Sequence, residues 1–159
     1  EGIARGVRTQ AGVELVPCEA SDPPLHDQDR ELGGRFRPGD FGFFTSEQGG
    51  ACFWVNIVGQ RARYAVVRRY AACGPRADTL TIGPVGCLSP QEARAATLAA
   101  VRWAQKRAAR LEISVPGPHQ ALPDLLAAGF RIDYIETFCS TTLFPVRPAQ
   151  YLGSGGDLF

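Results

Sequence analysis

Five cysteines give the chain its most reactive side chains, and their spacing decides what chemistry they could do. They are widely spread, with no C-x-x-C pair and no histidine pair at zinc-ligand spacing. An odd number of scattered thiols is typical of a protein kept in the reducing cytosol rather than of a disulfide framework. The sequence therefore predicts no metal site, no disulfide framework and a cytoplasmic location. The five are Cys18, Cys52, Cys73, Cys87 and Cys139.

The sharpest local signal is at Ser89, where a helix is predicted to begin. Serine is a favoured N-cap residue, Pro90 suits the first helical position, and Glu92 stands three residues after the serine, so the three form a capping box. A helix start also presents backbone N–H groups and the positive end of the helix dipole, to which an anion can bind. The segment therefore fits either an anion site or a well-capped structural helix.

The elements that would position this helix start follow from apolar spacing and turn residues. The helix after Ser89 is predicted to run to about Arg110, with an apolar stripe at helical spacing. Gly59-Gln60 suits the tight turn of an antiparallel hairpin, and residues 70–78 are predicted to be a loop. The stripe consists of Leu98, Val101, Ala104 and Ala108. Strands are predicted at residues 12–18, 51–58, 63–67, 79–85, 111–115, 130–137 and 139–144, and further helices at 22–32, 40–44 and 119–128.

These elements alternate in the order β-α-α-β-β-β-α-β-α-β-β, which predicts a mixed α/β (α+β mixed-sheet) fold. The length of 159 residues is that of one domain, and 45% apolar with 21% charged residues is a globular composition. A formal charge of +1 gives no global attraction to nucleic acid or to an anionic membrane. The chain begins at Glu1 and contains no methionine, so we expect a piece of a longer protein whose missing part lies N-terminal.

Residues 13–144 resemble the GCN5-related N-acetyltransferase (GNAT) superfamily. The resemblance is strongest in VPGPHQALPDLLAAGF, residues 115–130, where Gly129-Phe130 stand in the place of the superfamily's Gly-Phe. TIGPVGCLSPQEARAATL, residues 81–98, resembles the central strand and the cofactor helix. DRELGGRFRPGDFGFF and PAQYLGSGGDLF resemble the second domain of bacterial proteins that carry two such domains in tandem. The domains implied are a linker or remnant at 1–12, a GNAT-like domain at 13–145 and a docked tail at 146–159.

The resemblance implies an acetyl-CoA site where the central strand meets the next helix. In the superfamily the cofactor pyrophosphate lies at that helix start. The family pattern there is a Gln or Arg, then a Gly three residues later, then a Gly or Ala two residues after that. The best register here gives Pro90, Ala93 and Ala95, so the basic residue and the glycine are both absent. The implied cofactor residues are Val85, Gly86, Cys87, Ser89, Gln91, Ala93, Arg94 and Ala95.

The capping box would oppose that cofactor. Ser89 would take the N–H of Glu92, and the Glu92 carboxylate would stand close to a diphosphate. Each effect costs about 1 kcal/mol. Together they would reduce affinity roughly ten- to thirtyfold.

No residue is assigned as the catalyst. The superfamily's tyrosine general acid corresponds to Leu125, which cannot donate a proton, with Asp124 beside it. Other candidates each have an ordinary structural interpretation as well: Tyr134 and Tyr151 as acids, Asp78 as a base, and His119 in the place of a common asparagine.

The acceptor side of the fold is expected at Arg35, Arg37 and Asp40, before an aromatic helix that Asp40 could cap. The C-terminal segment from Tyr151 to Phe159 is expected to dock in a groove of this domain or of a neighbour. A parting of the strands at 79–85 and 111–115 would leave room for the pantetheine arm of acetyl-CoA, whereas a closed ladder would not.

Two functions remain open from the sequence. The first is an acetyl-CoA-dependent N-acetyltransferase with a degenerate cofactor motif, acting on a small-molecule amine. The second is a non-catalytic GNAT-like domain that supports a catalytic N-terminal GNAT domain of the same protein or binds a small effector. A homodimer is compatible with both, and neither nucleic acid nor membrane is expected as a partner.

Overall fold

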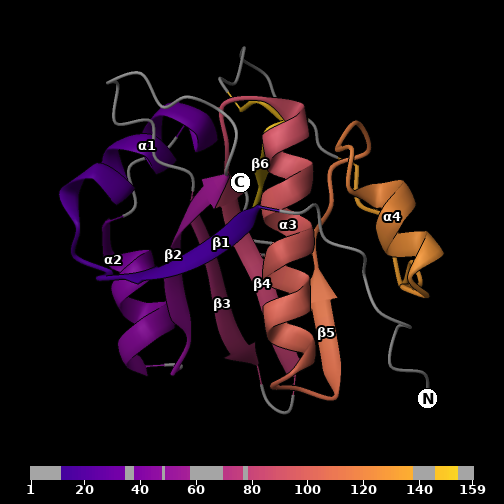
Figure 1. The fold of residues 1–159 in the computed structure, drawn as a ribbon, viewed down its shortest axis with the longest axis horizontal. Helices are drawn as coiled ribbons and strands as arrows, with labels where there is room; N and C mark the ends of the chain where they lie inside the picture. The colour runs from indigo at the N-terminus through magenta and orange to yellow at the C-terminus, as the bar shows by residue number, and fades with distance from the viewer. Residues whose placement is uncertain are drawn as a thin grey trace.

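The computed structural model describes residues 12–34, 38–47, 49–57, 70–76, 79–137 and 146–153. These residues form one mixed sheet with helices packed against it, so the fold class is mixed α/β, as predicted (Figure 1). In chain order the elements are β1 (Val13–Cys18), α1 (Pro23–Gly33), α2 (Pro38–Gly42), the π-helical turn η1 (Phe43–Glu47), β2 (Ala51–Ile57), β3 (Tyr70–Arg76), β4 (Thr79–Gly86), α3 (Pro90–Gln105), β5 (Arg110–Ile113), α4 (Leu122–Ala127) and β6 (Tyr151–Leu152).

The sheet runs in the order β1-β2-β3-β4-β5, with β6 added on β4. β1 to β4 pair antiparallel with their neighbours, and β5 pairs parallel to β4. The parallel pair is joined through α3, since a parallel crossover needs a long connection. β4 pairs with β3, β5 and β6, so it has the most strand partners in the described sheet.

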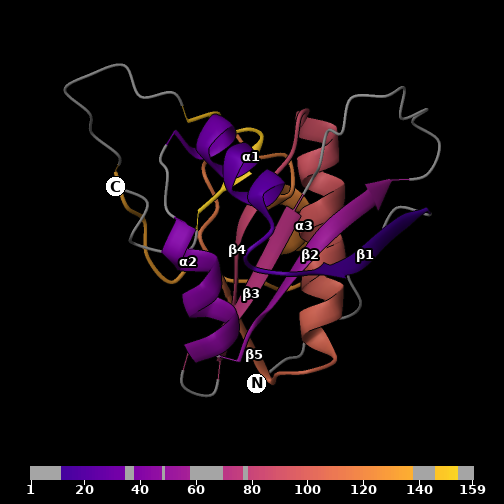
Figure 2. The same cartoon turned by 90° about the vertical axis from the view of Figure 1, so that its left-hand side faces the viewer.

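Alternation along β2 assigns the two faces of the sheet. Phe53 meets Trp103 of α3 edge to face at 4.9 Å, and Val55 belongs to the same apolar cluster as the buried face of α3. Cys52, one position out of phase, packs with Leu25 and Phe41 from the other helices. Figure 2 shows α1 and α2 on the opposite side of the sheet from α3. Two separate cores result, one on each face.

The cap predicted at Ser89 is confirmed, and the helix it starts is shorter than predicted. Ser89 is the N-cap of α3 and accepts from the Glu92 N–H, but the helix ends at Gln105 rather than near Arg110. The apolar stripe Leu98, Val101 and Ala104 is buried against the sheet. An alanine-rich stripe lets the helix lie close to β4.

One predicted loop is a strand. Residues 70–76 contain Gly74-Pro75, which reads as a turn, yet they form β3 between β2 and β4. Pairing with β2 ends at Cys73. The missing N–H of Pro75 therefore interrupts no hydrogen-bond ladder with β2. Partners on both sides of residues 70–73 outweigh the local turn propensity.

Three other predictions about elements are wrong in detail. Residues 130–137 form no strand, because no described strand pairs with them; Phe130 packs against the core under α3, and residues 131–137 are exposed. The helix predicted from residue 119 begins at Leu122. Asp40 lies in the first turn of α2 rather than capping a helix. The turn at 59–60 and the strands predicted at 63–67 and 139–144 lie outside the described residues.

Candidate functional site

The candidate site lies where β4 changes partner. Thr79 to Ile82 pair with β5, and the pairing ends at Ile82 with Ile113. Val85 and Gly86 keep β3 on one edge but pair with β6 on the other. β6 is therefore on the same edge of β4 as β5, beyond the point where β5 turns away. The pairing of β4 with β5 therefore stops partway along β4, but the edge so released carries a strand of the same chain.

Gln150 ties this C-terminal segment to the end of β4. Its backbone carbonyl accepts from the Cys87 N–H at 3.0 Å, and its side-chain Nε2 donates to the Leu88 carbonyl at 2.7 Å. The turn before it is held as well, because the Arg147 N–H donates to the Leu32 carbonyl at the end of α1 at 3.4 Å. The segment is thus bonded at the sheet and at α1.

Tyr151 anchors the segment on the α1 face of the sheet. Its hydroxyl donates to Oδ1 of Asp29 at 3.0 Å, and both side chains are buried, at 1% and 3% exposed. Gly33 makes room for the ring, since a Cβ there would lie 2.8 Å from the Tyr151 Cζ. A buried carboxylate needs hydrogen-bond donors, so Tyr151 both packs against Gly33 and supplies one donor to Asp29.

Leu152 faces the other core. It is fully buried and belongs to the cluster of Val85, Cys87 and the buried face of α3, whereas Tyr151 belongs to the α1 cluster. Successive residues of a strand point to opposite faces. The two residues of β6 therefore complete both cores of the sheet.

The start of α3, the implied pyrophosphate site, is closed by its own residues. Ser89 Oγ accepts from the Glu92 N–H at 3.3 Å, and Oε2 of Glu92 accepts from the Leu88 N–H at 3.2 Å. The Ala93 N–H donates to the Ser89 carbonyl at 3.0 Å, and Pro90 has no N–H. Of the first turn, only the Gln91 N–H is left for a ligand among the described residues.

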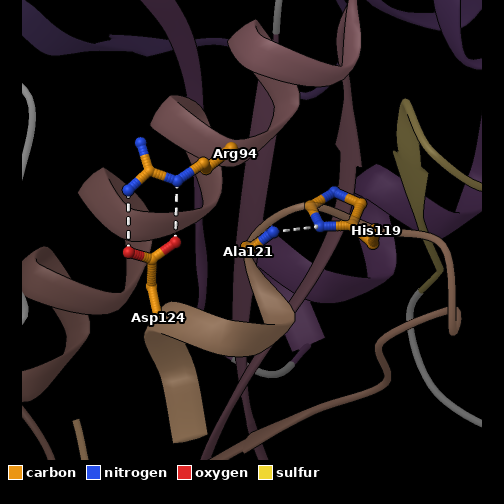
Figure 3. Close-up of polar contacts among 4 residues, drawn as sticks. All are labelled: Arg94, His119, Ala121 and Asp124. Atoms are coloured by element: carbon orange, nitrogen blue, oxygen red, sulfur yellow. Dashed lines mark hydrogen bonds and ion pairs between the residues drawn. The ribbon is translucent and has the colours of Figure 1, made fainter. Parts of the chain in front are cut away.

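Arg94 is engaged by the next helix. Its Nε and Nη2 donate to the two carboxylate oxygens of Asp124 in α4, both at 2.7 Å (Figure 3). This bond lowers the pKa of Asp124 and raises that of Arg94. Bidentate pairs of this kind are short and directional. The guanidinium is held toward α4 as a clasp between two helices rather than as a free phosphate ligand.

His119 is a buried neutral base beside this clasp. Its Nδ1 accepts from the Ala121 N–H at 3.2 Å, closing the turn that leads into α4 (Figure 3). The side chain is 1% exposed, and burial lowers its pKa to about 4. Its Nε2 has no hydrogen-bond partner among the described residues. The histidine is a turn residue with one buried nitrogen unsatisfied.

The remaining candidates do not gather at the site. Tyr134 is 66% exposed, and Leu125 is a core residue. Gln91 is exposed at the surface of α3, whereas Ala93 and Ala95 are buried under it. Asp40 lies in α2, on the other face of the sheet from α3. Arg35, Arg37, Asp78, Leu158 and Phe159 lie outside the described residues.

Cys18 and Cys52 are cross-strand partners at the end of the β1–β2 ladder. Burial raises the pKa of Cys18 to about 11, with smaller contributions from Asp22 and Glu19. Burial, then the neighbouring Cys18, raises the pKa of Cys52 to about 12. Such thiols stay protonated at neutral pH and are poor nucleophiles.

The described residues offer neither a metal centre nor a membrane span. Their His, Cys, Asp and Glu side chains form no group of three or more that could hold a metal ion. Cys18, Cys52 and Cys87 are free thiols. None of the helices within the described ranges is long and apolar enough to cross a membrane.

The arrangement does not fit the cofactor that the resemblance implies. A diphosphate at the α3 start would meet a single N–H donor and the Glu92 carboxylate, which is 5% exposed. Its like charge would be repelled where little water screens it. An extended pantetheine arm would compete with β6 for the edge of β4.

The residues that hold segment 150–152 in place carry no signal in the local sequence. Gln150, Asp29 and Gly33 carry ordinary roles for their types, and their partners are distant in sequence. Tyr151 and Asp29 are 122 residues apart. The one available signal was the apolar pair Tyr151-Leu152 within a Gly- and Pro-rich stretch.

Compared with models of protein families, with curated proteins and with solved structures, the chain matches none.

Proposed function

We propose that the chain is a GNAT-like domain that does not transfer acetyl groups and that supports a catalytic domain of the same protein. The observation that carries this proposal is the closed start of α3. Ser89 and Glu92 take up the donors that a cofactor pyrophosphate would need, and Glu92 adds a buried carboxylate.

The order of the described elements supports the GNAT-like part of the proposal. A strand that parts from its parallel neighbour and leads directly into a helix is the arrangement that the sequence resemblance implies. The supporting role rests on the tandem-domain resemblance of residues 29–44 and 148–159. Binding of a small effector is the other form that a non-catalytic role could take.

Calorimetric titration of the chain with acetyl-CoA tests the proposal. We expect no measurable heat up to 1 mM ligand. Binding at a micromolar Kd would overturn it. Glu92→Gln, which removes the charge and keeps an acceptor for the Leu88 N–H, is the matched variant. Tighter binding by this variant than by the wild type would assign the loss of affinity to the carboxylate.

The second candidate is an acetyl-CoA-dependent N-acetyltransferase. One observation favours it: β4 and β5 part after Ile82, where an extended ligand could pair with β4 if β6 were displaced. The three positions considered for a general acid do not supply one: Leu125 cannot donate a proton, Tyr151 is bonded to Asp29, and Tyr134 is exposed at the surface. Acetylation of a panel of amines by the chain, with free CoA released, would establish this function.

A further inference from the structure

We infer that the end of β4 at Val85 and Gly86, together with Cys87 directly after it, is a strand-binding site whose resident ligand is the chain's own segment 150–152. The segment meets the site as an added strand does, with backbone pairing for affinity and alternate side chains for specificity. This inference deepens the proposed function and rests on it only in equating this edge with the superfamily's cofactor cleft.

The backbone of β4 supplies the first half of the site. Val85 pairs with Leu152 and Gly86 with Tyr151, and the Cys87 N–H donates to the Gln150 carbonyl. Val85 and Cys87 are fully buried. Without the segment, polar backbone groups at the centre of the sheet would lose partners in an apolar surrounding.

Two side-chain contacts supply the second half, one on each face. Tyr151 lies against Gly33 and donates to Asp29 on the α1 face. Leu152 enters the cluster under α3. A segment that fitted only by backbone pairing would not need a glycine at Gly33 or a buried acceptor at Asp29.

Gln150 contacts the end of the site. Its side-chain Nε2 donates to the Leu88 carbonyl at 2.7 Å, and the Leu88 N–H donates to Glu92. The segment and the capped helix start are therefore joined through Leu88. A ligand that displaced Glu92 from the α3 start would therefore also disturb the bond between Leu88 and Gln150.

A disulfide test fixes the register of the segment. Cys87 follows β4 directly after the Gly86–Tyr151 pair, and its N–H is bonded to the Gln150 carbonyl, so Gln150→Cys would place a second thiol opposite it. Opposed antiparallel residues lie about 4.5–5.5 Å apart at Cα, within the roughly 4.4–6.8 Å range that a disulfide spans. Oxidised glutathione takes the two hydrogens and leaves as two thiols.

We expect peptide mapping to find the introduced cysteine joined to Cys87. Arg147→Cys, in the exposed turn three residues earlier, should not join Cys87, and Gln150→Ser controls for loss of the amide. Joining by Arg147→Cys but not by Gln150→Cys would overturn the register, and so would absence of both cross-links.

A peptide test measures recognition. A fluorescent peptide of residues 147–153 is titrated into the full chain and into a chain ending at residue 146. We expect at least tenfold tighter binding to the shortened chain, and at least tenfold weaker binding when the peptide carries Tyr151→Ala. Equal binding to both chains would overturn the inference. If circular dichroism finds the shortened chain unfolded, the disulfide result decides. Acetyl-CoA binding by the full chain would instead overturn the proposed function, so the two failures are distinguishable.

Discussion

At the scale of single residues, the same side chain can support a site or close it, and its partners decide which. Ser89 is a residue that could cap a helix or leave room for a phosphate. Its Oγ accepts from the Glu92 N–H, and the glutamate turns back to the Leu88 N–H. These two bonds make the α3 start a stabilising element.

Replacing the cap should therefore cost stability. We expect Ser89→Ala to lower the free energy of unfolding by about 1 kcal/mol, the usual cost of losing an N-cap. Urea denaturation followed by circular dichroism measures it. Ser46→Ala, at an exposed position of η1, is the matched control and should change stability by less than about 0.5 kcal/mol. Equal effects at the two positions would contradict the capping role.

His119 gives the fold a dependence on pH. Burial lowers its pKa to about 4 from the ordinary 6.5, so the unfolded chain binds the proton first as the pH falls. Its contribution is present above pH 6.5 and is lost as the pH falls toward 4. Between pH 7 and pH 4.5 we expect the wild type to lose about 2 kcal/mol from this group.

The variant that isolates this effect is His119→Asn, whose side-chain oxygen can still accept from the Ala121 N–H. Urea denaturation of both proteins at the two pH values gives the comparison. The loss on acidification should be smaller in the variant by the stated amount, whatever its stability at pH 7. Parallel losses in the two proteins would refute the assignment to His119.

At the scale of elements, the bond between Arg94 and Asp124 joins α3 to α4. Both side chains are partly exposed, at 39% and 32%, so solvent screens the pair. A double-mutant cycle with Arg94→Ala and Asp124→Ala should give a coupling of about 1 kcal/mol. The coupling should fall in 1 M salt.

The control cycle uses the pair Arg30 and Asp27 within α1, which is 3.4 Å apart and more exposed. Its coupling should be about 0.3 kcal/mol. Arg94→Lys should lose most of the α3–α4 coupling, because lysine cannot make the two parallel bonds. A control coupling as large as that of Arg94 and Asp124 would mean that the clasp adds nothing specific.

The elements also mark what could be predicted from the sequence. Local signals were enough for α3, whose cap and apolar stripe stand within one segment, and for β2 and β4. They failed at β3, where Gly74-Pro75 reads as a turn but pairing on both sides of residues 70–73 makes a strand. They failed in the opposite sense at 130–137, where Ile132 and Tyr134 alternate like a strand yet have no ladder partner among the described strands. Local propensity does not predict which distant segments pair with each other.

At the scale of the whole molecule, the C-terminal segment joins parts that are far apart in sequence. Tyr151 contacts α1, Leu152 completes the core under α3, and both pair with β4. The sequence predicted that the segment beginning at Tyr151 docks, but the contacts of Tyr151 are with Asp29 and Gly33, more than 100 residues away in the sequence. The two cores therefore share one closing strand.

Gly33→Ala, at the end of α1, should disturb β6 although the two elements are far apart in the sequence. The new Cβ would lie 2.8 Å from the Tyr151 Cζ and 2.9 Å from its hydroxyl oxygen. Because the ring is 1% exposed and bonded to Asp29, it can move only by lengthening that bond or by shifting β6. Overpacking of this kind costs about 1–3 kcal/mol.

Gly42→Ala is the matched control, since its added Cβ meets nothing within 4 Å. Two readouts separate a local clash from a loosened strand: the free energy of unfolding, and the rate at which a thiol reagent modifies Cys87, mapped by mass spectrometry. If the segment closes both cores, Gly33→Ala lowers the first and raises the second, whereas Gly42→Ala leaves Cys87 protected. Unchanged protection of Cys87 in a destabilised Gly33→Ala would confine the effect to α1 and contradict a shared closing strand.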